Sequence, residues 1–238
     1  MQLNQPTIQG ALEEALERFT GESIRIRGAS RTDSGAHARG QVVDFLTHSQ
    51  HSTQRFPPAL NYFLAEDIRV LWAAQVADGF HSRRSALSRI YQYRILAREE
   101  PTALLRHTHL WERAPLDTDR MAQAAWQLTG THDFRVISPS HPKDRSAVRR
   151  VSRWEVRRKA EIVIIECEAN GFLRQQIRKV NGILLDIGKG KRQVEFMGRA
   201  LEGTEDVSDI PVLPARGLCL MEVKYPVGAL DAPPDETG

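Results

Sequence analysis

Apolar positions recur along the chain at helix and strand periods, and the clearest pattern is a helix in the second half. Its apolar residues follow one another at alternating steps of four and three: Leu173, Ile177, Val180, Leu184 and Ile187. This spacing predicts one continuous buried stripe, on a helix that the glycines at 188 and 190 end. Three polar residues are expected on the opposite side of this helix: Arg174, Arg178 and Asn181.

The other predicted elements are shorter. A helix is expected over 8–20, with Thr7 as its N-cap and Gly21 just past its end. Further helices are predicted at 57–63, 117–128 and 193–201. Alternating or continuous apolar runs predict strands at 23–28, 41–47, 68–75, 89–97, 151–157, 162–167 and 217–225.

The order of these elements predicts an α+β fold. From residue 89 the second half runs strand, helix, strand, strand, helix, strand, which is the split βαβ unit of RRM-like domains. From residue 7 the first half has the same order without its opening strand. We therefore expect two similar halves, 1–100 and 101–226, that share a mixed, largely antiparallel sheet with a central cleft. Residues 227–238 are expected to form a flexible tail.

Composition places the chain among globular proteins. Its 238 residues are 41% hydrophobic, enough to bury a sizeable core. There is no apolar run of about 18 residues, and the start lacks the basic-then-apolar order of a signal peptide. We expect a cytoplasmic protein with no membrane partner. Cys167 and Cys219 stand alone in strand-like runs, so buried thiols are predicted rather than a disulfide or a zinc site.

Arginine is unusually abundant. The chain has 27 arginines and 6 lysines at a net charge of only +3. Eight basic residues cluster between Lys143 and Lys159, around Trp154. Because guanidinium binds phosphate as a fork and stacks on bases, this segment suggests an RNA-binding surface with Trp154 as a stacking ring. Codon composition accounts for the arginine richness equally well, and the segment is also compatible with a solvated hairpin face.

One glycine-punctuated connection, residues 28–40, contains several charged groups. The chain has no zinc-protease, phosphate-loop, dinucleotide-binding or serine-hydrolase motif, and its histidines show no metal spacing. Asp33 is the best catalytic candidate, because a carboxylate acts as a nucleophile or base without a metal or organic cofactor. Arg31, two residues earlier, carries a charge that favours the ionised form.

Two alternatives for Asp33 stay open. Thr-Asp-Ser-Gly is also a plausible turn in which the carboxylate binds only backbone amides. Asp33, Ser34 and Gly35 also match the Asp-Ser-Gly of aspartic proteases, which need two carboxylates that share a proton. The chain has no second copy of that motif, so such a protease would require a homodimer, and the neighbouring Arg31 argues against it.

Tyr91, Tyr93 and Ile95 fall on one face of the predicted strand 89–97. A ring at such a position can stack on a base that has been pulled out of its helix. Aromatic residues at strand spacing are more often part of the core. Tyr91 is therefore a candidate for base stacking, with an ordinary core position as the alternative.

Several segments together resemble the tRNA pseudouridine synthase A (TruA) family. Residues 30–38 (SRTDSGAHA) match its G-R-T-D-x-G-V-H-A signature. Companion segments follow in the family's order: 59–61 with 66–70, 80–86 with 89–93, 130–134, 170–173 with 177–182, and 214–218 with 225–226. The resemblance covers residues 6 to 226.

This resemblance implies the pseudouridine synthase fold and a cofactor-free isomerase that forms pseudouridine in the anticodon stem-loop of tRNA, at positions 38–40, usually as a homodimer. By motif position, Asp33 corresponds to the catalytic aspartate and Arg31 to a residue that positions it. Tyr91 corresponds to the tyrosine that packs on the target uracil, and Arg178 to the basic partner of the aspartate. Arg89, His37 and Phe172 are expected to bind substrate, although for His37 a structural hydrogen bond within the loop is the first expectation.

The chain departs from the family pattern in three places. Ser30 replaces a glycine and Ala36 a valine. Relatives also begin with a strand that has no counterpart before Thr7, which leads us to expect either a misplaced translation start or a truncation. An RNA-binding or chaperone relative with impaired catalysis is therefore the alternative function.

Overall fold

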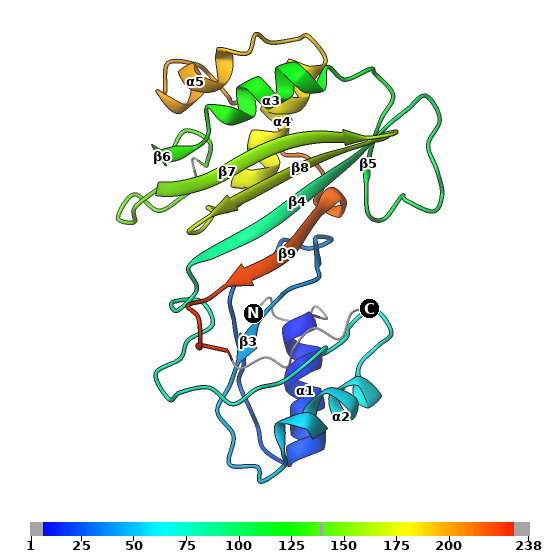
Figure 1. The fold of residues 1–238 in the computed structure, drawn as a ribbon, viewed down its shortest axis with the longest axis vertical. Coiled ribbons are helices and arrows are strands. Elements are labelled where there is room, and N and C mark those ends of the chain that lie inside the picture. The colour runs from blue at the N-terminus through cyan, green and yellow to red at the C-terminus, as the bar shows by residue number, and fades with distance from the viewer. Residues whose placement is uncertain (1–6, 139, 231–238) are drawn as a thin grey trace. The chain divides into compact units, whose positions relative to one another are not determined.

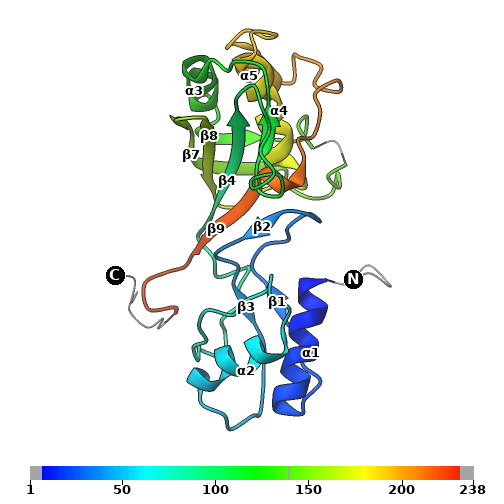
Figure 2. The ribbon, with the colours of Figure 1, turned by 90° about the vertical axis from the view of Figure 1, so that its right-hand side faces the viewer.

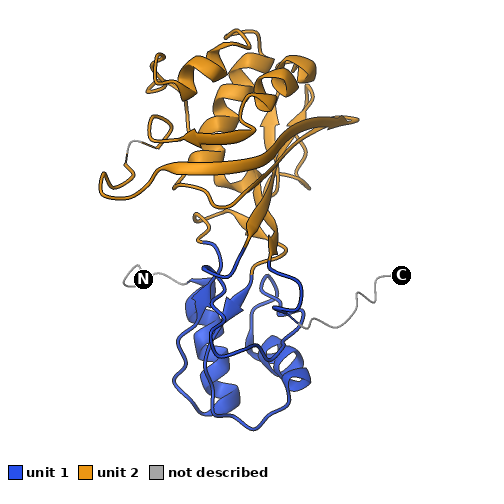
Figure 3. Cartoon of the chain, turned by 60° about the vertical axis from the view of Figure 1, so that its left-hand side comes forward, with its two compact units in different colours: residues 1–30, 42–86, 225–238 blue, residues 31–41, 87–224 orange. Residues whose placement is uncertain are grey.

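The computed structural model describes residues 7–138 and 140–230, which form two compact units. Unit 1 comprises residues 1–30, 42–86 and 225–238, and unit 2 comprises 31–41 and 87–224 (Figure 3). These boundaries differ from the halves expected from chain order, because the loop that carries Asp33 belongs to unit 2. The segment before Thr7, where the opening strand of the family pattern is expected to be missing, and most of the expected tail lie outside the described residues.

The part of unit 1 that the structure describes contains two helices, a short 3-10 turn and a small sheet. Helix α1 spans Ile8–Thr20, and both of its predicted caps are confirmed. The Thr7 side chain accepts a hydrogen bond from the Gly10 amide, and Gly21 adopts the left-handed conformation that ends the helix, with φ 77°. The 3-10 turn η1 covers Thr53–Arg55, and the predicted second helix follows it as α2, Phe56–Phe63.

The strands of unit 1 are much shorter than predicted. Among the described residues of this unit, β1, Arg27–Gly28, and β3, Val43–Asp44, pair as an antiparallel two-stranded sheet. Segment 68–75 has no described strand, because the Asn61 side chain hydrogen-bonds both the amide and the carbonyl of Val70 at 2.8 Å. Those are the groups that a sheet ladder would use. The apolar alternation nevertheless identified residues that pack in the core, such as Ile24 and Ile26.

Unit 2 is built on a seven-stranded sheet (Figures 1 and 2). Its main path runs β2-β9-β4-β8-β7-β6, and β5 pairs with β4. The bounds are β2 His37–Ala38, β4 Ser88–Ala97, β5 Leu110–Glu112, β6 Gly130–Asp133, β7 Val148–Lys159, β8 Ile162–Ala169 and β9 Leu218–Lys224. The pairs β2–β9 and β4–β5 are parallel and the other pairs are antiparallel. The prediction of an α+β fold with a mixed, largely antiparallel sheet is confirmed.

The split βαβ unit predicted for the second half is present. Strands β4, β7, β8 and β9 lie in the order β9-β4-β8-β7, which is the ferredoxin-like arrangement. The helices α3, Thr118–Trp126, α4, Gln176–Gly188, and α5, Phe196–Leu201, lie on one side of this sheet (Figure 1). Of the strands that precede β4, β2 joins this sheet, whereas β1 and β3 form the separate small sheet.

Helix α4 differs from its prediction in two ways. It begins at Gln176 rather than near Leu173, because Gln175 adopts a left-handed conformation with φ 59°. It is also buried on almost every side, so Asn181, expected opposite the apolar stripe, is fully buried. The Asn181 side-chain oxygen accepts a hydrogen bond from the Trp154 indole at 3.2 Å, whereas its amide nitrogen has no hydrogen-bond partner among the described residues.

The basic segment around Trp154 is not the stacking surface that the sequence suggested. Trp154 is only 2% exposed and packs in the core of unit 2. Its neighbours Arg153 and Arg157 both form ion pairs with Glu166, on the adjacent strand. The strand alternation explains this outcome, since alternate residues of β7 face the helices and the ion pairs lie on the other face.

Candidate active site

The Asp33 loop makes a tight turn immediately before β2. The Ala36 amide donates to the Asp33 carbonyl at 3.0 Å, and Gly35 between them has φ 80°. This is the position at which a type II turn requires glycine. The turn is therefore closed by the main chain, so the Asp33 carboxylate is not needed to close it.

The carboxylate of Asp33 instead forms an ion pair with Arg178. Arg178 Nη1 lies 2.7 Å from Asp33 Oδ2, and the side chains are 14% and 30% exposed, respectively. Arg178 lies in the first turns of α4, whose buried position fixes the base of the side chain. The alternative in which Asp33 binds only backbone amides is thus not what the structure contains.

A short segment after α5, residues 213–217, holds Arg178 from a second direction. We call it the strap. The guanidinium Nε of Arg178 donates to the Leu213 carbonyl at 2.5 Å, and the Leu213 amide donates to the Arg178 carbonyl at 3.3 Å. The strap includes the 3-10 turn η2, Ala215–Gly217, and leads directly into β9. Arg178 therefore has one nitrogen on the strap and another on Asp33.

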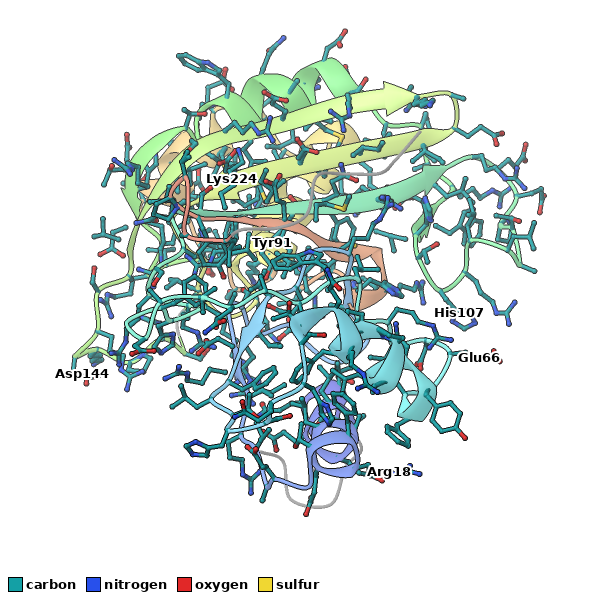
Figure 4. All side chains as sticks on the ribbon, turned by 60° about the horizontal axis from the view of Figure 1, so that its bottom comes forward. Arg18, Glu66, Tyr91, His107, Asp144 and Lys224 are labelled. Atoms are coloured by element: carbon teal, nitrogen blue, oxygen red, sulfur yellow. The ribbon has the colours of Figure 1, made fainter. Side chains whose placement is uncertain are left out.

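Tyr91 belongs to a group of three aromatic side chains. Its ring meets that of Phe172 edge to face, with centroids 5.4 Å apart. Phe172 in turn meets Trp154, at 6.2 Å. Tyr91 lies on β4 (Figure 4) and is 4% exposed. The expectation that Tyr91, Tyr93 and Ile95 share one strand face agrees with the register, which pairs them with Cys167, Ile165 and Val163 on β8.

The sheet register relates the Asp33 loop to Tyr91. Ala38 on β2 pairs with Leu220 on β9, and Leu220 pairs with Tyr91 on β4. The strand that follows the Asp33 turn is therefore two strands away from Tyr91 at the same level of the sheet. Tyr93, two residues further along β4, lies close enough to Arg178 for the guanidinium charge to act on its hydroxyl.

The remaining predicted site residues have other contacts. Arg89 is buried and donates from Nη1 to the Asn170 carbonyl at 2.9 Å, next to the segment that carries Phe172. Arg31 is exposed, and among the described residues the ion pair of Asp33 is with Arg178 rather than Arg31.

His37 does not make the expected hydrogen bond within its own loop. Its Nε2 donates to the carbonyl of His107 at 2.7 Å. His107 lies on the long connection between β4 and β5 (Figure 4). The same connection is held a second time, by Arg216 of the strap, which donates to the His109 carbonyl at 3.3 Å. His37 and Arg216 thus both bind main-chain carbonyls of this connection.

Sequence reasoning missed the strap and Tyr93. The motif at 214–218 contained most of the strap, but no pattern in it indicated contact with Arg178. Tyr93 was grouped with Tyr91 and given no role, yet its hydroxyl donates to the Pro214 carbonyl at 2.8 Å. Burial raises the pKa of this hydroxyl well above its ordinary value, although the Arg178 and Arg216 charges act in the opposite direction.

The chemistry available at Asp33 is that of a carboxylate paired with a guanidinium, close to the buried hydroxyl of Tyr93. Within residues 7–138 and 140–230, no three His, Cys, Asp or Glu side chains are grouped as a metal site requires. The same residues include no helix that is long and apolar enough to span a bilayer. A carboxylate oriented by arginine is suited to nucleophilic attack or proton transfer.

Comparison with known proteins identifies relatives over nearly the whole chain. The sequence model of a family described as tRNA pseudouridine synthase matches residues 2–83 and 124–226. A tRNA pseudouridine synthase A from Methylococcus capsulatus is 39% identical over 92% of this chain and 81% of its own length. Proteins of the same name from Sinorhizobium fredii and Allorhizobium ampelinum are 40% and 41% identical. Each match covers 94% of this chain, with 92% and 87% of the relatives' lengths.

Proposed function

This chain belongs to the tRNA pseudouridine synthase family, and we propose that it isomerises uridine to pseudouridine in tRNA. The finer proposal is that the target uridines lie at positions 38–40 of the anticodon stem-loop and that Asp33 is the nucleophile. The observation that supports this most directly is the ion pair between Asp33 and Arg178, which joins two of the motifs that carry the family resemblance.

The proposed reaction moves one glycosidic bond and needs no net oxidant or reductant. A carboxylate oxygen of Asp33 attacks the nucleoside and the bond between N1 of uracil and C1′ of the ribose breaks. The free uracil turns while it stays bound, and its C5 forms the new bond to C1′ as the Asp33 oxygen leaves. The proton on C5 is then lost and N1 gains one, so that atoms and charge balance.

Arg178 has a specific part in this scheme. Its Nη1 fixes one carboxylate oxygen, which leaves the other oxygen of Asp33 to react. A held nucleophile and a held substrate convert the attack into an intramolecular step, which lowers the entropic part of the barrier. We assign Arg31 to positioning Asp33 and Tyr91 to packing on the uracil and to proton transfer at the isomerised ring.

The substrate uridine must leave its base stack before it can reach Asp33. Extruding a nucleotide from its stack costs a few kcal/mol, which arginine contacts to phosphate and stacking on an aromatic ring can offset. We assign Arg89, His37 and Phe172 to this binding. A cytoplasmic homodimer acting on the anticodon arm completes the proposal.

The test uses unmodified tRNA transcripts and the purified full chain. Pseudouridine is mapped by carbodiimide labelling after incubation with wild type, Asp33→Ala or Asp144→Ala. Asp144 is exposed and serves as the matched control. We expect product at positions 38–40 with wild type and the control, and none with Asp33→Ala although tRNA binding persists. Full activity of Asp33→Ala would exclude the mechanism, and tRNA binding without product by wild type would favour the RNA-binding alternative.

A further inference from the structure

Tyr93 is a fully buried tyrosine, and its hydroxyl, the one polar group of the side chain, forms a hydrogen bond with the strap. It is 0% exposed, and its hydroxyl donates to the Pro214 carbonyl at 2.8 Å. A hydroxyl that is removed from water must find such a partner, because an unsatisfied buried donor costs about 1–3 kcal/mol. The hydrogen bond therefore fixes Pro214 relative to β4.

The strap also packs directly on the Tyr93 ring. A β-carbon added at Gly217 would lie 2.7 Å from Cζ of Tyr93 and 3.1 Å from the Arg94 carbonyl. Those are the ring end that bears the hydroxyl and the backbone of the same strand, so neither can move away easily. Glycine at 217 thus lets the strap lie against Tyr93 closely enough to form the hydrogen bond.

The residue before Pro214 is the one that holds Arg178. The Leu213 carbonyl accepts from Arg178 Nε at 2.5 Å, while Arg178 Nη1 donates to Asp33 at 2.7 Å. Nε and Nη1 belong to one rigid planar group. A shift of Leu213 therefore rotates the guanidinium and changes its contact with the carboxylate.

We propose that Tyr93 is a positioning residue for the reaction: its hydroxyl holds the strap, and the strap orients the Arg178 guanidinium toward Asp33. This inference rests on the proposed function for its effect on turnover. Tyr93 itself touches neither Asp33 nor substrate in this scheme. The role differs from that of Tyr91, which lies two residues away on the same face and next to Phe172.

The first test needs no substrate. The Nε–H group of Arg178 is identified by nuclear magnetic resonance as the signal that disappears in Arg178→Lys, and its hydrogen exchange rate is measured. We expect Tyr93→Phe to accelerate this exchange at least tenfold, because the strap is released. Tyr225→Phe is the matched control, since its hydroxyl donates to the Ser82 carbonyl, at 2.6 Å, in unit 1. It should leave the Arg178 signal unchanged.

The second test measures turnover as tritium released from C5 of labelled uridine in tRNA. Tyr93→Phe should lower kcat by about tenfold, the size of one lost hydrogen bond, with the KM for tRNA within about twofold. Tyr225→Phe should change kcat by less than about twofold. Thermal melting of both variants measures the general loss of stability, for which kcat is corrected by the folded fraction.

The outcomes separate the two proposals. If wild type releases no tritium, the proposed function fails, and the exchange rate of Arg178 still decides the role of Tyr93. Unchanged exchange in Tyr93→Phe would overturn the inference. So would a kcat per folded molecule equal to that of wild type, because Tyr93 would then stabilise the fold without orienting Arg178.

Discussion

Arg178 Nη1 lies 2.7 Å from Asp33 Oδ2 although 145 positions separate the two residues in the sequence. Asp33 sits on a glycine turn and Arg178 on a buried helix, so each approaches from a different element of unit 2. Both side chains are partly shielded from water, which strengthens their attraction relative to a surface pair. The pair is therefore the natural target for the first substitution.

Arg178→Lys keeps the positive charge but loses the planar fork. A lysine can reach either Asp33 or the Leu213 carbonyl in the manner of arginine, but it cannot present two fixed donors to both at once. We expect kcat to fall at least tenfold while the melting temperature changes little. Steady-state kinetics and calorimetry measure the two quantities. Wild-type kcat in this variant would show that the charge alone suffices.

Gly40→Ala should destabilise unit 2. The added β-carbon would lie 2.3 Å from the Met221 carbonyl oxygen, so β2 and β9 could not remain at their present separation. We expect a loss of more than about 2 kcal/mol in the free energy of unfolding, as for other overpacked sites. Gly79→Ala is the control, because nothing lies within 4 Å of its added atom. Urea denaturation of both variants provides the comparison, and equal midpoints would contradict the close approach.

Trp154→Phe should weaken the core beneath Tyr91. The substitution removes the indole donor to Asn181 and part of the ring that packs near Phe172. The free energy of unfolding is expected to fall by about 2–4 kcal/mol, because the substitution leaves a cavity and leaves the amide oxygen of Asn181 without a donor. Trp126→Phe, at a site that is 77% exposed, should be nearly neutral. Chemical denaturation followed by circular dichroism measures both, and a neutral Trp154→Phe would mean that the core readily closes the gap.

Asp44→Asn should reduce the stability of unit 1 in a pH-dependent way. Burial alone would raise the pKa of Asp44, but hydrogen bonds from Ser82 and Arg27 outweigh it and hold the pKa below its ordinary value of 3.8. A lowered folded-state pKa means that the stabilisation is present above about pH 4 and disappears as the pH falls through the folded value. The expected difference from wild type is about 1–3 kcal/mol at pH 7.

The measurement is the free energy of unfolding of wild type and Asp44→Asn between pH 7 and pH 2.5. The two curves should converge toward the acid end, because the wild-type carboxylate is then protonated and loses its advantage over the amide. Parallel curves across this range would mean that Asp44 contributes through packing rather than charge.

Local patterns predicted the helices and the long strands well. The apolar stripe of α4 and the alternation of β4 depend on side chains that all face one buried surface, so a short window contains the information. The strand predicted at 68–75 is not present, because Asn61 takes the backbone groups of Val70, and no local pattern reveals such hydrogen bonds.

The sequence predicted which residues belong to the candidate site better than it predicted the hydrogen bonds between them. Asp33 and Arg178 followed from sequence motifs, and the structure brings them together. The hydrogen bonds of His37 with His107, of Arg178 with Leu213 and of Tyr93 with Pro214 join residues that are distant in sequence. Such bonds depend on how the strap and the β4–β5 connection pack, which requires the whole sheet to be in place.

The parallel pairing of β2 with β9 determines when, during synthesis of the chain, the Asp33 loop can dock on the sheet. His37 cannot meet its partner Cys219 until the intervening residues and β9 have left the ribosome, which takes about ten seconds or more at about 5–20 residues per second. The Asp33 turn is thus translated well before the strand that holds the segment following it in place. Until β9 emerges, a nascent chain carries Asp33 on a loop that is not yet docked on the sheet.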